Sequence, residues 1–195
     1  MFDSIFHLLA DEPQAYLILF AVAAGDAVFP ALPSESAVIV GGLLSVVGDL
    51  SIGWVIVAAA AGAFVGDSTS YAIGRFFGRP VQRRFFDGRR GRAALEWARG
   101  QLARRGGTLI LVARFVPGGR TATTFSAGLT RFPLRIFFPY ALLAAIGWAT
   151  YAAVLGYVGG RTFEDRPWLA LLIALGIAFG IAFASEGARR IRERA

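Results

Sequence analysis

The chain contains no cysteine, no lysine and a single histidine. Without cysteine, disulfides, thiolate nucleophiles and cysteine-ligated metals are excluded. The one histidine, His7, lies outside the apolar runs, which argues against a histidine metal cluster and against a Ser-His-Asp triad. A membrane phosphatase would need a nucleophile or a general base of this kind. We therefore expect no metal, no other cofactor and no enzymatic activity.

Long apolar runs dominate what is present. Hydrophobic residues make up 56% of the 195 residues, and the mean hydropathy is +0.58, which exceeds the values of ordinary soluble domains. A helix needs about 20 residues to cross roughly 30 Å of hydrocarbon. Residues 52–77, 132–158 and, only just, 168–184 are long enough. The sequence predicts an all-α integral membrane protein with about four transmembrane helices, the first of them within 14–29.

One apolar run is broken in its middle. Residues 108–129 contain a Pro-Gly-Gly sequence at 117–119, with Arg114 on one side and Arg120 on the other. A proline followed by two glycines ends a helix, and the freed backbone groups cannot face lipid. Since neither half can span the membrane alone, the pattern predicts a re-entrant helical hairpin.

A second interruption lies in the first third of the chain. Pro30 and Pro33 break an apolar run, and the apolar residues that follow, 36–47, are too few to cross. This pattern predicts a second re-entrant hairpin. With a cytoplasmic N-terminus, the hairpin near Pro30 opens outward and the hairpin near Pro117 opens to the cytoplasm.

Basic residues gather between the two halves of the chain. Residues 75–105 carry ten arginines and two acidic residues, and four more arginines lie at 189–194. The positive-inside rule places both segments in the cytoplasm, so we expect a multi-pass protein of the inner (plasma) membrane. The part from 93 to 105 predicts either a helix in the membrane interface or a solvated basic loop. Anionic lipid headgroups account for this charge, and we expect no nucleic-acid partner.

The two halves resemble each other in the order and spacing of their motifs. Residues 14–78 form a first repeat and 107–160 a second; the basic loop 79–106, with its interfacial helix, separates them, and a transmembrane helix at 168–187 follows. Each repeat contains a broken hairpin and then a long, glycine-containing helix. Ordinary close packing of helices gives similar glycine spacing, which is the alternative. Hairpins that open to opposite sides favour an inverted repeat within a single membrane domain.

Charged residues lie in or beside the apolar runs, where an unpaired charge costs from about 2.5 to more than 10 kcal/mol. Folding the two hairpins together would bring acids and bases into one polar pocket. Guanidinium groups near a hairpin tip can bind a phosphate through bidentate hydrogen bonds, and carboxylates in the same pocket can take up and release protons. We assign substrate binding to Arg114, Arg120 and Ser34, and proton coupling to Glu35, Asp26 and Asp67.

Several of these residues also have a simpler interpretation. The Ser-Glu pair at 34–35 can form a helix start, because serine is a good N-cap and an acid suits the positive end of a helix. Asp26 can lie in the headgroup zone, Asp67 can hydrogen-bond a neighbouring helix, and Arg120 can snorkel to the interface. Arg114 has apolar residues on both sides and therefore has the strongest need for a partner.

Four motifs resemble those of the DedA family, whose shared region is also called the VTT or SNARE-associated domain. They are residues 26–35 (DAVFPALPSE), 66–78, 114–120 (RFVPGGR) with Ala127-Gly128, and Gly147-Trp148 with Gly156-Tyr157. The resemblance covers roughly residues 15–160. It departs from the family pattern in two places, since aspartate stands at 26 where glutamate is common and Ala31 replaces a frequent proline.

The resemblance implies a protein that moves lipids between leaflets, with undecaprenyl phosphate and phosphatidylethanolamine among the family's substrates. It also implies that two acids and two arginines carry the function, and these match Asp26, Glu35, Arg114 and Arg120. We therefore expect a flippase or scramblase for an anionic lipid, with membrane lipids and their headgroups as partners and protons as the coupling ion. The alternatives are a proton-coupled exporter of small cations or solutes and a non-transporting membrane scaffold.

Overall fold

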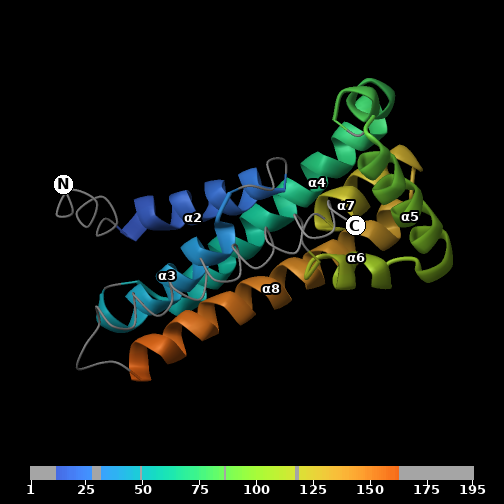
Figure 1. Cartoon of the computed structure of the whole chain (residues 1–195). Coiled ribbons are helices and arrows are strands. Elements are labelled where there is room, and N and C mark those ends of the chain that lie inside the picture. The colour runs from blue at the N-terminus through green and yellow to red at the C-terminus, as the bar shows by residue number, and fades with distance from the viewer. Residues whose placement is uncertain (1–11, 28–31, 49, 86, 117–118, 163–195) are drawn as a thin grey trace, which may run out of the picture. The chain divides into compact units, whose positions relative to one another are not determined.

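A computed structural model of the chain describes residues 12–27, 32–48, 50–85, 87–116 and 119–162 (Figure 1). These residues form seven α-helices, and no strand occurs among them. The helices are α2 (Glu12–Asp26), α3 (Ser34–Val47), α4 (Ile52–Phe85), α5 (Arg89–Arg105), α6 (Thr108–Ala113), α7 (Gly119–Leu129) and α8 (Leu134–Thr162).

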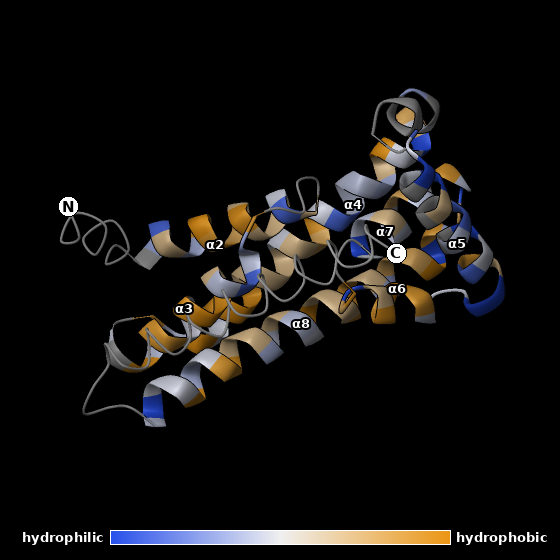
Figure 2. Ribbon diagram, in the orientation of Figure 1, coloured by the Kyte–Doolittle hydropathy of each residue, from blue (hydrophilic) through white to orange (hydrophobic). Residues whose placement is uncertain are grey.

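Two of these helices are long and apolar enough to cross a membrane. The qualifying segments are Ile52–Gly78, with 27 residues, and Leu134–Thr162, with 29. At a rise of about 1.5 Å per residue, each exceeds the roughly 30 Å of a bilayer core. The helices predicted over 52–77 and 132–158 are confirmed, while the span predicted over 168–184 lies outside the described residues. Figure 2 shows apolar residues along α3 and α8 and a concentration of hydrophilic residues on α5.

Both predicted interruptions coincide with ends of helices. α2 ends at Asp26 and α3 begins at Ser34, while α6 ends at Ala113 and α7 begins at Gly119. With 14 and 11 residues, α3 and α7 are each too short to cross a bilayer. The apolar run 108–129 is therefore two helices, as its central Pro-Gly-Gly sequence predicts.

The long helix α4 is kinked near its end. Its backbone leaves helical geometry at Phe77, where φ is −117° and ψ is 17°. Pro80 follows within one turn, and a proline inside a helix removes one hydrogen bond and clashes with the preceding turn. The proline thus accounts for the kink, which separates the apolar part of α4 from its basic end.

The basic segment between the two halves is also helical. Of the two alternatives for residues 93–105, the structure shows a helix, α5, which begins earlier, at Arg89; its location in the membrane interface stays a prediction. It packs against α6 and α7. Leu102 on α5 is buried among the apolar residues of this part of the chain, whereas Trp97 is exposed. At least part of the apolar stripe of α5 therefore packs against protein.

The chain divides into two compact units. Among the described residues, unit 1 comprises 12–19, 33–58 and 149–162, and unit 2 comprises the rest, within 20–32 and 59–148. A core cluster in unit 2 contains Tyr71, Leu102, Leu109, Ile110, Ala113, Ala127, Phe137 and Ala141.

In unit 1, α3 and the last part of α8 touch through their backbones. A Cβ atom on Gly42 would overlap the carbonyl group of Ala153, and a Cβ atom on Gly156 would overlap the carbonyl group of Ile39. Each helix thus has one glycine in direct contact with the backbone of the other helix. Small residues of this kind allow close approach of helices that pack in a membrane.

In unit 2, α4 and α7 make a contact of the same form. A Cβ atom on Gly74 would overlap the carbonyl group of Phe125, and one on Gly128 would overlap the carbonyl group of Tyr71. In both units, the glycine and the contacted carbonyl on each helix are three residues apart. The close approach of α4 and α7 sets the distance between the charged side chains that these two helices carry.

The end of α2 packs against α4 in the same manner. A Cβ atom on Gly62 would overlap the carbonyl group of Phe20, and a Cβ atom on Gly66 would lie 2.5 Å from the carbonyl oxygen of Ala24. These two glycines bring the second half of α2 against α4. Asp26, the last residue of α2, is thereby held within unit 2.

Candidate functional site

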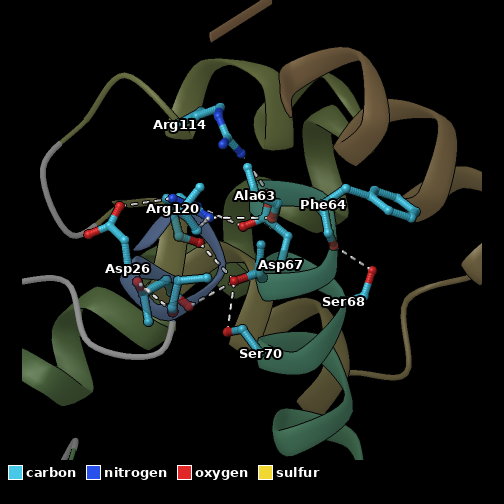
Figure 3. A network of polar contacts seen from close by, with 12 residues as sticks. Asp26, Ala63, Phe64, Asp67, Ser68, Ser70, Arg114 and Arg120 are labelled. Atoms are coloured by element: carbon cyan, nitrogen blue, oxygen red, sulfur yellow. Dashed lines mark hydrogen bonds and ion pairs between the residues drawn. The ribbon is translucent and has the colours of Figure 1, made fainter. Parts of the chain in front are cut away.

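A buried acid, Asp67, lies at the centre of a charged cluster in unit 2 (Figure 3). It sits in the apolar part of α4 and its side chain is 2% exposed. The hydroxyl groups of Ser68 and Thr69, its neighbours, donate to the carbonyl groups of Phe64 and Val65 within the same helix. Of residues 67–69, Asp67 is thus the one whose side chain contacts other parts of the chain.

Arg114, the residue that follows α6, is the first partner of Asp67. Its Nη1 donates a hydrogen bond to Asp67 Oδ2 at 2.7 Å, and its side chain is also 2% exposed. The guanidinium carbon Cζ lies over the ring of Trp148 on α8, 4.8 Å from the ring centroid. An ion pair and a cation–π contact therefore stabilise the same buried cation.

Arg120, in the first turn of α7, is the second partner. Its Nε donates to Asp67 Oδ1 at 2.7 Å, and its Nη1 donates to Asp26 Oδ2 at 3.0 Å. Its Nη2 lies 3.4 Å from the carbonyl oxygen of Ala63 and 3.5 Å from that of Ala23. Every nitrogen of this guanidinium group has an acceptor.

The two arginines differ in how many of their donors are used. In Arg114, Nε and Nη2 are buried and have no hydrogen-bond partner among the described residues. These two nitrogens form one edge of the guanidinium group, and such an edge is the geometry that binds a carboxylate or phosphate through two parallel hydrogen bonds. Arg114 thus carries an unused bidentate donor, whereas Arg120 carries none.

The charges within the cluster cancel. Two carboxylates, of Asp26 and Asp67, face two guanidinium groups, of Arg114 and Arg120. Buried ions of one sign would be very costly in a low-dielectric environment, whereas a paired and hydrogen-bonded set is tolerated. An anion that binds this cluster would leave it with net negative charge.

Hydroxyl groups continue the polar contacts along the interface of α4 and α7. Thr124 Oγ1 and Ser70 Oγ are 2.9 Å apart, and Thr124 Oγ1 also lies 3.0 Å from the Arg120 carbonyl oxygen. Thr121 Oγ1 donates to the carbonyl group of Ala27 at 3.3 Å. These contacts fix the first turn of α7, from which Arg120 projects.

Four of the six residues predicted for the site come together in unit 2. They are Asp26, Asp67, Arg114 and Arg120. Asp67 accepts a hydrogen bond from the neighbouring helix α7, as its simpler interpretation predicts, and a second one from Arg114. Arg120 contacts two acids, which does not fit the interpretation that it snorkels to the interface. The cluster contains no third acid or histidine that could make a metal site, and no such group occurs elsewhere among the described residues.

The other two predicted residues, Ser34 and Glu35, belong to unit 1. They form the start of α3, where Ser34 is buried and Glu35 lies in the first turn. The N-cap position is Pro33, with no side-chain hydrogen bond, so the interpretation of Ser34 as the N-cap is wrong. The contacts that define the charged cluster come from unit 2 alone, and the roles of Ser34 and Glu35 stay predictions.

The sequence did not indicate the contact between Trp148 and Arg114. Trp148 belongs to the Gly-Trp pair at 147–148, which carries part of the family resemblance, and this pair was the only signal that could have pointed to it. A ring that contacts an arginine from a distant part of the sequence leaves no local pattern.

Comparisons with known proteins identify relatives of this chain. Residues 32–158 match the model of the VTT domain, a range that includes Asp67, Arg114 and Arg120. The chain is 33% identical to Protein DedA of Escherichia coli over 164 residues, which cover 81% of this chain and 73% of that protein. No solved structure gives a significant match.

Two further relatives are membrane proteins by name. An uncharacterized membrane protein of Synechocystis is 34% identical over 178 residues, which cover 85% of this chain and 80% of that protein. Inner membrane protein YohD of Escherichia coli is 28% identical over 162 residues, covering 83% and 77%. The helices, the buried ion pairs and these relatives define a helical membrane protein. The chain belongs to the DedA family, the family of the VTT domain.

Proposed function

We propose that this protein is a flippase or scramblase for an anionic membrane lipid, and that Arg114 binds the phosphate of the headgroup. The observation that carries the proposal is the unused Nε and Nη2 edge of Arg114, which is buried and faces no acceptor among the described residues. A buried donor without a partner costs about 1 to 3 kcal/mol. A ligand that accepts both hydrogen bonds relieves this cost.

The residues around Arg114 favour a ligand that is both charged and apolar. Val112, Phe115 and Val116 are exposed large hydrophobic side chains, and Phe115 is 64% exposed. Exposed apolar side chains next to a buried guanidinium group match a lipid, whose phosphate contacts the arginine while its tails lie against apolar surface. A small soluble anion would gain nothing from these side chains.

The proposal includes two re-entrant hairpins related by an inverted repeat. The breaks before α3 and α7 support the hairpins, and the matching glycine contacts support the repeat. In the repeat, α3 corresponds to α7 and α8 to α4, because Gly42 and Gly156 make the contacts in unit 1 that Gly128 and Gly74 make in unit 2. A transporter can use such a repeat to alternate the access of one site between the two sides.

This correspondence suggests a role for the predicted residues of unit 1. With Gly42 aligned to Gly128, Ser34 takes the position at the start of α3 that Arg120 takes at the start of α7. We keep Ser34 as a substrate-binding residue and Glu35 as a proton-coupling residue on this basis. We also keep the basic segment 75–105 and the C-terminus on the cytoplasmic side of the inner membrane.

Protons compensate charge in the proposed cycle. The cluster is neutral when it is empty, so a bound phosphate group gives it a net negative charge. A proton taken up together with the phosphate would restore neutrality and avoid a buried excess charge. Lipid and proton would then move together, and the transport rate would depend on the pH difference across the membrane.

An exporter of small cations is less consistent with the site. The carboxylates of Asp26 and Asp67 already bind guanidinium groups, so a cation would have to displace an arginine. A scaffold role makes a different prediction, since it requires the fold of the cluster but no free donor edge on Arg114. Transport assays separate these three functions.

The test uses the purified protein in proteoliposomes with lipids that carry a label on the headgroup. Lipids with one phosphate and neutral glycolipids with the same tails are compared for their exposure in the outer leaflet. The proposal predicts faster redistribution of the phosphate lipid with protein than without it, and no effect on the glycolipid. The proposal would be contradicted if every phosphate lipid tested redistributed at the same rate with and without the protein, both in the presence and in the absence of a pH difference across the membrane.

A further inference from the structure

We propose that Trp148 is a positioning residue of the anion site: its ring fixes the guanidinium plane of Arg114 so that the Nε and Nη2 edge stays available to a phosphate. This inference rests on the proposed function, because it takes Arg114 as the phosphate contact. Trp148 itself touches the arginine and need not touch the lipid. The contact between the two residues lies within unit 2.

The arginine is held on two sides. One side is the hydrogen bond from Nη1 to Asp67, and the other is the ring of Trp148, whose centroid is 4.8 Å from Cζ. A single hydrogen bond would allow the guanidinium group to turn about its side-chain bonds. The ring next to Cζ restricts that rotation and offers no acceptor to Nε and Nη2, which keep no hydrogen-bond partner among the described residues.

A tryptophan suits this position better than an acid would. A second carboxylate would compete for Nε and Nη2 and would repel an incoming phosphate. An indole ring attracts the cation through its face, accepts none of the in-plane hydrogen bonds and carries no charge. Burial strengthens the attraction, and Trp148 is only 7% exposed.

The surroundings of Trp148 on α8 also set it apart. α8 buries the large ring of Phe137 near its start and, in the two turns before Trp148, only the small residues Ala141, Ala144 and Ala145. Trp148 is therefore the one large buried side chain that α8 contributes to unit 2 after these two turns. The ring stands where α8 meets the guanidinium group of Arg114.

The first test measures binding of a defined probe. The full-length protein in nonionic detergent is titrated with monododecyl phosphate, and the dissociation constant is measured by calorimetry. Loss of a buried cation–π contact should weaken binding about tenfold in Trp148→Leu, while Trp148→Phe, which keeps an aromatic face, should recover most of that loss. Trp97→Leu, which removes an exposed tryptophan outside the site, should bind like the wild type.

The second test uses a signal that a merely structural role would not produce. With Trp54, Trp97 and Trp168 replaced by phenylalanine, all tryptophan fluorescence comes from Trp148. Phosphate at the edge of Arg114 changes the field at the ring, so the emission should change with probe concentration and saturate. The additional substitution Arg114→Gln should abolish this response.

The outcomes distinguish this inference from the proposed function. A wild-type protein that does not bind the probe would contradict both. Two results would contradict only the role of Trp148. One is equally tight probe binding in the wild type and in Trp148→Leu, and the other is a Trp148 emission that does not change when the probe binds. If Trp148→Leu does not fold, the comparison of Trp148→Phe with the wild type and the fluorescence titration decide the question.

Discussion

Asp67 holds both arginines of the cluster at once: its Oδ2 accepts a hydrogen bond from Arg114 Nη1 and its Oδ1 accepts one from Arg120 Nε, each at 2.7 Å. Both oxygens are thus used, and the carboxylate joins the residue after α6 to the first turn of α7. The two ends of the second helix break are therefore fixed to α4 through one side chain. This arrangement gives the residues of the cluster different roles.

Replacement of Asp67 by alanine should destabilise the protein strongly. The change leaves two buried or partly buried guanidinium groups without their shared partner, and removal of one member of a buried ion pair costs about 3 to 5 kcal/mol. Thermal unfolding in detergent measures the effect. As the matched control, Asp87→Ala removes an exposed acid whose pair with Arg92 spans 3.6 Å, and it should change the free energy of unfolding by less than about 0.5 kcal/mol.

The two arginines should differ in their effect on stability. Arg120→Met removes contacts to Asp26, Asp67 and two backbone carbonyl groups, whereas Arg114→Met leaves Asp67 paired with Arg120 and removes two unpartnered buried donors. We expect Arg120→Met to lower the unfolding temperature clearly more than Arg114→Met. Unfolding scans of the two variants under identical conditions provide the comparison, and a larger loss for Arg114→Met would refute the division of roles.

The glycines at the helix contacts should resist substitution. Gly128→Ala and Gly42→Ala place a Cβ atom onto a backbone carbonyl group, so the helices must separate, at a cost of about 1 to 3 kcal/mol for an overpacked site. Gly147→Ala is the control, because a Cβ atom there meets nothing within 4 Å and alanine favours a helix. The unfolding temperature should fall for the first two variants and stay or rise for the third.

The absence of cysteine allows a clean test of the proposed orientation. A single cysteine at Gly100 on α5, where a Cβ atom meets nothing within 4 Å, should react with an impermeant maleimide in inverted membrane vesicles and stay unlabelled in intact spheroplasts. The positive-inside rule gives this expectation. Labelling in intact spheroplasts would place the basic segment on the outer side and reverse the topology.

The elements that the sequence predicts best are those set by local chemistry. The break at Pro117 and the long helices follow from backbone restrictions and from the length of apolar runs. The cost of unpaired charge in apolar surroundings identifies Arg114 as a residue that needs a partner, and it does so without any structure. These features require no knowledge of which helices touch.

The identity of each partner depends on the packing of helices and could not be read from the sequence. The sequence predicted one polar pocket for the acids and arginines but did not assign a partner to each charge. The structure pairs both Arg114 and Arg120 with Asp67, and the contacts of Gly74 and Gly128 bring α4, which carries Asp67, against α7, which carries Arg120. Trp148 was missed for the same reason. Glycine spacing indicates that a helix packs closely but does not indicate against which helix.

The most direct test of the central claim compares two arginines in the same transport assay. Arg114→Gln removes the unused donor edge, and Arg135→Gln removes an exposed arginine at the start of α8. In proteoliposomes with a labelled phosphate lipid, we predict that Arg114→Gln slows movement between the leaflets at least tenfold, because the variant loses a charge-assisted hydrogen-bonded contact. Arg135→Gln should keep the wild-type rate. A folded Arg114→Gln protein that moves the lipid as fast as the wild type would contradict the account.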